Sequence, residues 1–115
     1  MRIEVEFYDL PDGREPATEF INAQTNRMAA KILRTISLLE EKGISLREPY
    51  SKPLGDGIFE LRTILGSDIS RVLYFFMIGK KAVLTNGFIK KQDKTPPGEI
   101  VLAKKYRAEY LSREE

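Results

Sequence analysis

The pattern of apolar and polar residues in the first third of the chain predicts a strand followed by a long helical segment. Residues 2–8 carry an apolar side chain at every second position, which is typical of a strand with one buried face. Turn-forming residues in 9–16 end this strand. From 17 to 42 apolar residues recur at spacings of three and four, and the polar stretch 22–26 either kinks this helical segment or divides it in two. Gly43 is expected to cap the segment at its C-terminus. The expected buried stripe consists of Met28, Ala29, Ile32, Leu33, Ile36 and Leu39.

The remaining pattern predicts three strands and a closing helix. Residues 44–56 contain two prolines and are expected to be irregular. Three apolar or alternating segments follow, at 57–65, 69–78 and 81–89, and their short connections predict an antiparallel meander. After a double proline, the apolar spacing over 99–111 predicts a final helix.

The order of these elements predicts one α+β domain that spans residues 1–115. The first strand is expected to join the meander, which gives a small antiparallel sheet of about four strands. An N-terminal helix or helical hairpin and a C-terminal helix would lie together on one side of this sheet. Gly79 and Lys80 form a two-residue signal for the hairpin between the last two strands.

The absence of certain residue types restricts the chemistry. The chain contains neither His nor Cys, which excludes a Ser-His-Asp triad, imidazole or thiolate zinc sites, and disulfides. Acid–base chemistry would have to use Lys, Arg, Tyr, Asp or Glu. No apolar run approaches the ~20 residues of a membrane span, and the N-terminal residues do not form a signal peptide. We therefore expect a cytoplasmic protein without a metal, a cofactor or a membrane partner.

Charge is distributed unevenly along the chain, although the net charge is only +2. Residues 1–20 contain six acidic and two basic side chains, whereas residues 80–115 contain nine basic and five acidic ones. A basic C-terminal third favours an anionic partner; the alternative is a solvated, lysine-rich surface.

Charged residues within the predicted meander are the first candidates for a functional site. Glu60 and Arg62 share one face of the strand 57–65, because side chains alternate along a strand. Arg71 stands at the start of the most apolar segment and needs a carboxylate partner or a bound anion there. One interpretation is an ion pair of Arg62 or Arg71 with Glu60 across the sheet. The other is a phosphate site.

Basic residues at the edges of the meander would complete such a phosphate site. Lys52 precedes the meander, and Lys90, Lys91 and Lys94 follow it. Contacts of this kind supply affinity for a nucleic-acid backbone without sequence selectivity. Phe88, beside the lysines, is either a platform for a stacked base or a core residue at the end of a strand.

Three segments carry a resemblance to a known family. They are KPLGDGIFELR (52–62), SRVLYFF (70–76) and GFIKKQDKTPPGEIVLAKKYRAEY (87–110). Together they resemble the RelE/HigB superfamily of toxins from type II toxin–antitoxin modules, and more narrowly its phage-derived HigB-like branch. The resemblance covers nearly the whole chain.

The resemblance implies a RelE-like microbial ribonuclease fold and a ribosome-dependent mRNA endonuclease. Such toxins cut mRNA in the ribosomal A site without a metal, by attack of the 2′-hydroxyl on the adjacent phosphate. Some relatives place a Tyr or His soon after the last strand as a general acid or base, whereas this chain has Gln92, Asp93, Lys94 and Thr95 there. The acid and base are therefore left open. By motif position, the implied catalytic residues are Arg71, Lys90, Lys91 and Arg62, and the implied RNA-binding residues are Lys52, Phe88 and Lys94.

The resemblance also implies a partner, a helix-turn-helix antitoxin of the HigA type. Two other functions stay open from the sequence. One is a non-catalytic toxin that poisons DNA gyrase, and the other is a degenerate, non-toxic module that only binds its antitoxin.

Overall fold

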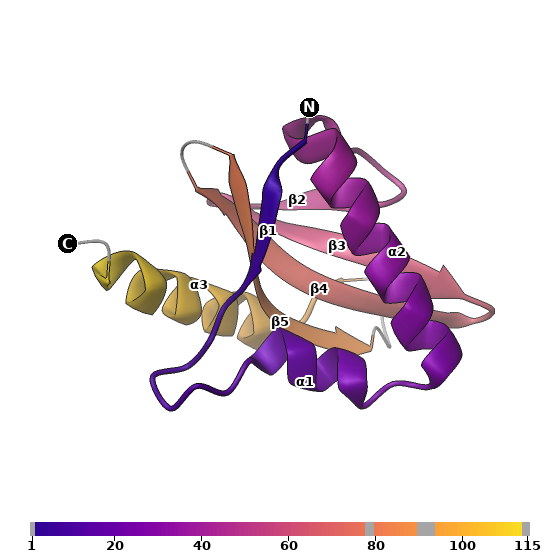
Figure 1. The fold of residues 1–115 in the computed structure, drawn as a ribbon, viewed down its shortest axis with the longest axis horizontal. Coiled ribbons are helices and arrows are strands. Elements are labelled where there is room, and N and C mark those ends of the chain that lie inside the picture. The colour runs from indigo at the N-terminus through magenta and orange to yellow at the C-terminus, as the bar shows by residue number, and fades with distance from the viewer. Residues whose placement is uncertain (1, 78–79, 90–93, 114–115) are drawn as a thin grey trace.

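The computed structural model describes residues 2–77, 80–89 and 94–113, which form one sheet with helices on both faces (Figure 1). The predicted α+β class is confirmed. The hairpin signal at Gly79 and the lysines Lys90 and Lys91 lie outside the described residues. The elements are β1 (Glu4–Phe7), α1 (Pro16–Asn22), α2 (Asn26–Lys42), the short 3-10 helix η1 (Gly43–Ser45), β2 (Ser51–Gly55), β3 (Ile58–Leu65), β4 (Asp68–Met77), β5 (Lys81–Ile89) and α3 (Pro97–Ser112).

The helical segment is divided into two helices at the polar stretch identified in the sequence. Thr25 lies between α1 and α2, and its side chain accepts a hydrogen bond of 3.1 Å from the backbone N–H of Met28. Such a cap satisfies a backbone donor that the first turn of a helix leaves free, so the second helix begins there. Gly43, at φ +57°, ends α2 as predicted. Leu33 was expected in the buried stripe but is 51% exposed.

The sheet differs from the expected four antiparallel strands in two respects. It has five strands in the order β1-β5-β4-β3-β2, and β1 pairs with β5 in parallel, so the sheet is mixed. The extra strand, β2, lies in the segment that its prolines marked as irregular. Proline has no backbone N–H to donate to a neighbouring strand. Pro53 is tolerated because β2 is at the edge of the sheet and has a neighbouring strand on one side alone.

The helices cover both faces of the sheet, which corrects the expectation that they lie on one side. In Figure 1, α2 crosses the strands on the near side. The strands β3 and β4 bury side chains on both faces, so each face needs its own cover. The face under α1 and α2 includes Leu61, Val72, Tyr74 and Leu84, and the face under α3 includes Ile58, Leu73, Phe75 and Val83.

A bulge in β5 sets which residues of that strand meet the helices. Tyr74 pairs with Leu84 and Val72 pairs with Gly87, so two residues of β5 lie against one residue of β4. Within the bulge, the Asn86 side chain donates a hydrogen bond of 3.0 Å to the Glu99 carboxylate at the start of α3. Gly87 faces the opposite way, against the ring of Phe20 in α1.

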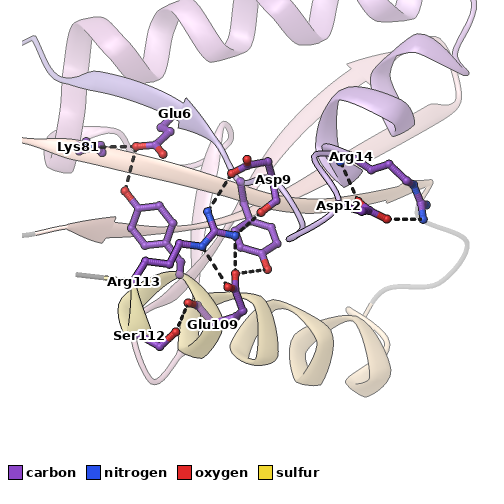
Figure 2. Close-up of polar contacts among 10 residues, drawn as sticks. Glu6, Asp9, Asp12, Arg14, Lys81, Glu109, Ser112 and Arg113 are labelled. Atoms are coloured by element: carbon purple, nitrogen blue, oxygen red, sulfur yellow. Dashed lines mark hydrogen bonds and ion pairs between the residues drawn. The ribbon is translucent and has the colours of Figure 1, made fainter. Parts of the chain in front are cut away.

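A polar network holds the C-terminal end of α3 against the segment that follows β1 (Figure 2). The Arg113 guanidinium donates to Asp9 Oδ1 at 3.0 Å and to Glu109 Oε2 at 3.0 Å. The Tyr8 hydroxyl donates to Glu109 Oε1 at 2.7 Å. Tyr110 and Lys81 both bind Glu6 Oε1, each at 2.9 Å. The two ends of the chain are thereby joined on the α3 face.

Replacing Gly87 by alanine is expected to lower the free energy of unfolding by about 1–3 kcal/mol, because the new Cβ would overlap the Phe20 ring. Urea denaturation measures the change. Gly98→Ala is the matched control, since nothing lies near its Cβ position. Equal stability of the two variants would contradict the packing of Phe20 on Gly87.

Tyr8 is expected to make stability depend on pH in the alkaline range. Burial and the hydrogen bond to Glu109 raise the pKa of Tyr8 to about 12. The folded chain therefore keeps this proton when the unfolded chain, with an ordinary tyrosine pKa near 10, has lost it. The stabilising contribution of Tyr8 to the free energy of unfolding is complete below about pH 10 and disappears as the pH rises towards about 12.

Tyr8→Phe should therefore show a smaller fall in the free energy of unfolding between about pH 9 and about pH 11 than the unmodified chain. Urea denaturation across this range provides the measurement. Tyr50→Phe, at an exposed tyrosine, is the control and should leave the pH dependence unchanged. A Tyr8→Phe profile that matches the control profile would rule out the proposed contribution.

Candidate functional site

The α3 face of the sheet carries a row of residues that the sequence analysis identified as functional candidates. In the register of β3 and β4, Arg62 lies opposite Arg71. In the register of β4 and β5, Arg71 lies opposite Phe88. Cross-strand partners share a face of the sheet, so these three side chains are neighbours on three adjacent strands. Lys52 of β2 lies opposite Glu60, one row further along the same face.

Glu60 is the centre of this site. Its side chain has no exposed surface, and one carboxylate oxygen accepts a hydrogen bond from Arg71 Nη1. Arg62 Nε lies 3.9 Å from the same oxygen. The other oxygen accepts a hydrogen bond from the Thr95 hydroxyl. The ion pair between Glu60 and Arg71, one of the two interpretations drawn from the sequence, is therefore present.

The site keeps a net positive charge, because one carboxylate faces two guanidinium groups. Burial lowers the pKa of the Arg71 guanidinium, the Glu60 carboxylate opposes this shift, and the Arg62 charge adds to it. Arginine stays protonated at neutral pH even after such a shift. Among the described residues, Arg71 Nε and Nη2 and Arg62 Nε are buried and have no hydrogen-bond partner. Such donors favour an anion or another acceptor nearby.

The two arginines differ in access to solvent. The Arg71 side chain is 3% exposed, whereas the Arg62 side chain is 19% exposed. Arg62 follows Leu61, the last residue of β3 that pairs with β2. Its backbone N–H donates a hydrogen bond of 2.8 Å to the carbonyl oxygen of Tyr50, the residue just before β2. Of the two arginines, Arg62 is therefore the one that an external anion reaches first.

Described residues on both sides of Lys90 and Lys91 in the sequence lie near Arg71. Phe88 is opposite Arg71, and Thr95 is bonded to the Glu60 carboxylate that also holds Arg71. The lysines themselves lie outside the described residues, so their predicted place in the site stays a prediction.

The other predicted RNA-binding residues lie around this row. Lys52 and Lys94 are exposed. Phe88 is partly buried and packs against the apolar cluster under α3. The structure thus brings Arg62, Arg71, Phe88, Glu60 and Lys52 onto one face, with Lys94 beside Thr95.

The tyrosines have structural contacts in this fold. Tyr74 lies on the α2 face, away from the row, and hydrogen-bonds Ser51 at 2.5 Å. Burial raises the pKa of Tyr74, so its hydroxyl stays protonated. Tyr106 stacks on Tyr8, and Tyr110 donates a hydrogen bond to Glu6.

Sequence reasoning treated Glu60 only as a partner for an arginine and did not assign Thr95 to the site. The alternation along β3 already placed Glu60 on the face of Arg62, so part of the signal was available. The contact between Thr95 and Glu60 joins residues 35 positions apart and could not be read from local pattern.

A family model, described as phage derived protein Gp49-like (DUF891), matches residues 19–108. The chain belongs to this Gp49-like family. The match includes every residue of the row and the whole segment from Lys52 to Lys94. No curated protein matches the chain.

The Gp49-like family is associated with toxin–antitoxin modules and is related to RelE/HigB-type toxins. This relation agrees with the resemblance drawn from the sequence at the level of the superfamily. The assignment of this Gp49-like chain to the HigB branch stays a prediction.

Residues 2–77, 80–89 and 94–113 contain neither a membrane-spanning helix nor an acidic metal-binding cluster. None of the helices there combines the length and the apolar character that a membrane span requires. The same residues contain no group of three or more acidic side chains suited to hold a metal ion.

Replacing Glu60 by leucine in this Gp49-like chain is expected to lower the free energy of unfolding by about 3–5 kcal/mol, because the Arg71 charge would stay buried without its partner. The double variant Glu60→Leu with Arg71→Leu should recover most of the loss. Urea denaturation of both variants measures the coupling. Glu48→Leu, at an exposed carboxylate, is the control and should change little. A double variant as unstable as Glu60→Leu alone would contradict the ion-pair account.

Proposed function

We propose that this protein is a toxin that cleaves mRNA on the ribosome. Family membership supports the toxin role. The observation that carries the proposed activity is the excess of positive charge around Glu60, where Arg62 and Arg71 share its single carboxylate. Preorganised cations of this kind stabilise the charge that develops on a phosphate during its cleavage.

The reaction would begin with attack of a ribose 2′-hydroxyl on the adjacent phosphorus. The hydroxyl loses its proton, the bond from phosphorus to the 5′ oxygen breaks, and that oxygen gains a proton. The products are a 2′,3′-cyclic phosphate and a 5′-hydroxyl. In the dianionic phosphorane between them, the extra negative charge would face Arg62 directly, with Arg71 contributing its charge from beneath the surface.

The flanking residues would hold the RNA strand. In the sequence, Lys90 and Lys91 follow directly after β5, and Lys94 precedes Thr95. We expect these lysines to add positive charge around a phosphate at Arg62. Lys52 would contribute from β2, and Phe88 offers a ring for a base. A helix-turn-helix antitoxin of the HigA type would be the cytoplasmic partner that neutralises the toxin.

Arg62→Ala tests the proposed activity. We expect the rate of mRNA cleavage on purified, programmed ribosomes to fall by about 10²–10³-fold, because a cation is removed from the transition state. This variant leaves the pair of Glu60 and Arg71 in place, so the chain should still fold, as circular dichroism would verify. Mass spectrometry should find the 2′,3′-cyclic phosphate at the cut ends.

Lys105→Ala, at an exposed lysine of α3, is the matched control and should leave cleavage unchanged. Arg71→Ala and the pair Lys90→Ala with Lys91→Ala should also abolish cleavage and the arrest of growth on induction. Full cleavage by folded Arg62→Ala and by the lysine pair would refute the site assignment.

A second candidate function is a non-catalytic toxin that poisons DNA gyrase. The burial of Arg71 in its ion pair with Glu60 favours it, because a buried arginine does not touch a substrate directly. Accumulated gyrase–DNA breaks together with intact mRNA after induction would identify this function instead of cleavage.

A further inference from the structure

A basic groove runs along the exposed side of α2, at a distance in sequence from the candidate site. It has a volume of about 410 Å³ and is lined by Asn26, Arg27, Ala30, Lys31, Arg34 and Leu65. We call it the α2 groove. Its three cations follow one another at spacings of four and three residues, so they stand on one side of the helix. All three are exposed, and none takes part in an ion pair with another described residue.

The α2 groove continues toward Arg62. A second pocket of about 200 Å³ shares Lys31 with the groove and is also lined by Tyr50 and Arg62. This pocket lies at the edge of β3 where the pairing with β2 has ended. A basic surface therefore extends from Arg27, along one side of α2, to Arg62, the more accessible arginine of the candidate site.

The residues that line these two pockets favour an anionic polymer. They include four cations and no carboxylate, although the chain contains 17 acidic residues. A regular series of cations suits a ligand with repeated negative charge, such as a phosphodiester backbone. A single bound anion would need only one of the three positions on α2.

Tyr50 distinguishes a nucleic acid from an acidic protein segment. Its side chain lines the second pocket, is 45% exposed, and makes no ring contact with any described aromatic residue. Grooves that bind single strands combine cations for the backbone with aromatic rings on which bases stack. An acidic peptide would pair with the cations but has no bases to stack on the Tyr50 ring.

We propose that the α2 groove binds the phosphodiester backbone of RNA, with Arg27, Lys31 and Arg34 on successive phosphates and Tyr50 stacked on a base. The inference rests on the proposed function, because it extends the path of the RNA beyond Arg62. The strand in the groove is the continuation of the mRNA, because the pocket that contains Arg62 shares Lys31 with the groove. A segment of ribosomal RNA is the other outcome that the test distinguishes. Both offer the same phosphate chemistry.

The test is a triple variant, Arg27→Gln with Lys31→Gln and Arg34→Gln, which we call the groove variant. Fluorescence anisotropy measures its affinity for a labelled single-stranded oligoribonucleotide at several salt concentrations. Sedimentation measures its affinity for vacant ribosomes, which carry ribosomal RNA but no mRNA. All three positions are exposed, so the fold should be retained.

The matched control is Arg2→Gln with Lys42→Gln and Lys105→Gln, which removes the same charge at exposed positions outside both pockets. We expect the groove variant to bind RNA at least about tenfold more weakly than this control. The slope of log K against log salt should also fall by about 2, because each lost contact with a single strand removes about 0.7. Tyr50→Ala should weaken binding about fivefold or more, and Tyr50→Phe should not.

The two RNA sources give different results. Weaker binding of the oligoribonucleotide identifies the mRNA strand, and weaker binding of vacant ribosomes alone identifies ribosomal RNA. The first result supports the proposal, and the second overturns it. A groove variant that matches the control on both ligands overturns it, and so does a groove variant that loses only its affinity for the co-expressed antitoxin.

The outcome is separable from that of the proposed function. If RNA binding depends on the α2 groove but the chain cleaves no mRNA, the proposed cleavage is refuted and the groove is supported as an RNA site. If cleavage depends on Arg62 but the groove variant binds RNA like its control, the proposed cleavage is supported and the groove is overturned as an RNA site.

Discussion

The fully buried carboxylate of Glu60 is the constraint around which the α3 face is organised. An ionised carboxyl group without partners inside a protein carries a desolvation cost of several kcal/mol. Here Arg71 supplies the opposite charge and Thr95 supplies a hydroxyl donor, so both oxygens have partners. Because these partners come from β4 and from the segment before α3, the interaction links the sheet to its last helix.

This constraint explains why polar residues lie in the middle of a sheet that is covered on both sides. The apolar cluster under α3 surrounds residues such as Leu73 and Phe75, and the polar row lies beside it on the same strands. The network at the far end of α3, where Arg113 joins Asp9 and Glu109, holds the other end of the helix in place. The helix is thus held by polar contacts at both ends, with Ala103 and Tyr110 buried between them.

Membership in the Gp49-like family, the net positive charge around Glu60 and the basic surface along α2 point to one partner chemistry. Arg62 is the residue common to the site and to the pocket that continues the α2 groove. A strand of RNA that follows this surface would need no metal site to be held. Its backbone would meet cations on a helix and at a sheet edge, both of which are rigid supports for such contacts.

The sequence by itself determined most of the elements, because these depend on local pattern. Alternation along β1 and β3, the apolar runs of β4 and β5 and the apolar spacing in α2 reflect surfaces that each element must bury. The polar stretch 22–26 marked the place where the helical segment divides. The placement of Glu60 and Arg62 on one face followed from the same alternation.

Only the tertiary structure decided how these elements combine. The parallel pairing of β1 with β5, the edge strand β2 with its Pro53, and the place of α3 on the second face depend on which surfaces remain uncovered after the other elements have packed. The contact of Thr95 with Glu60 and the meeting of Lys31 with Arg62 in one pocket join residues about 30 positions apart or more. Periodicity reports which side of an element is buried, and it carries no information about which partner buries it.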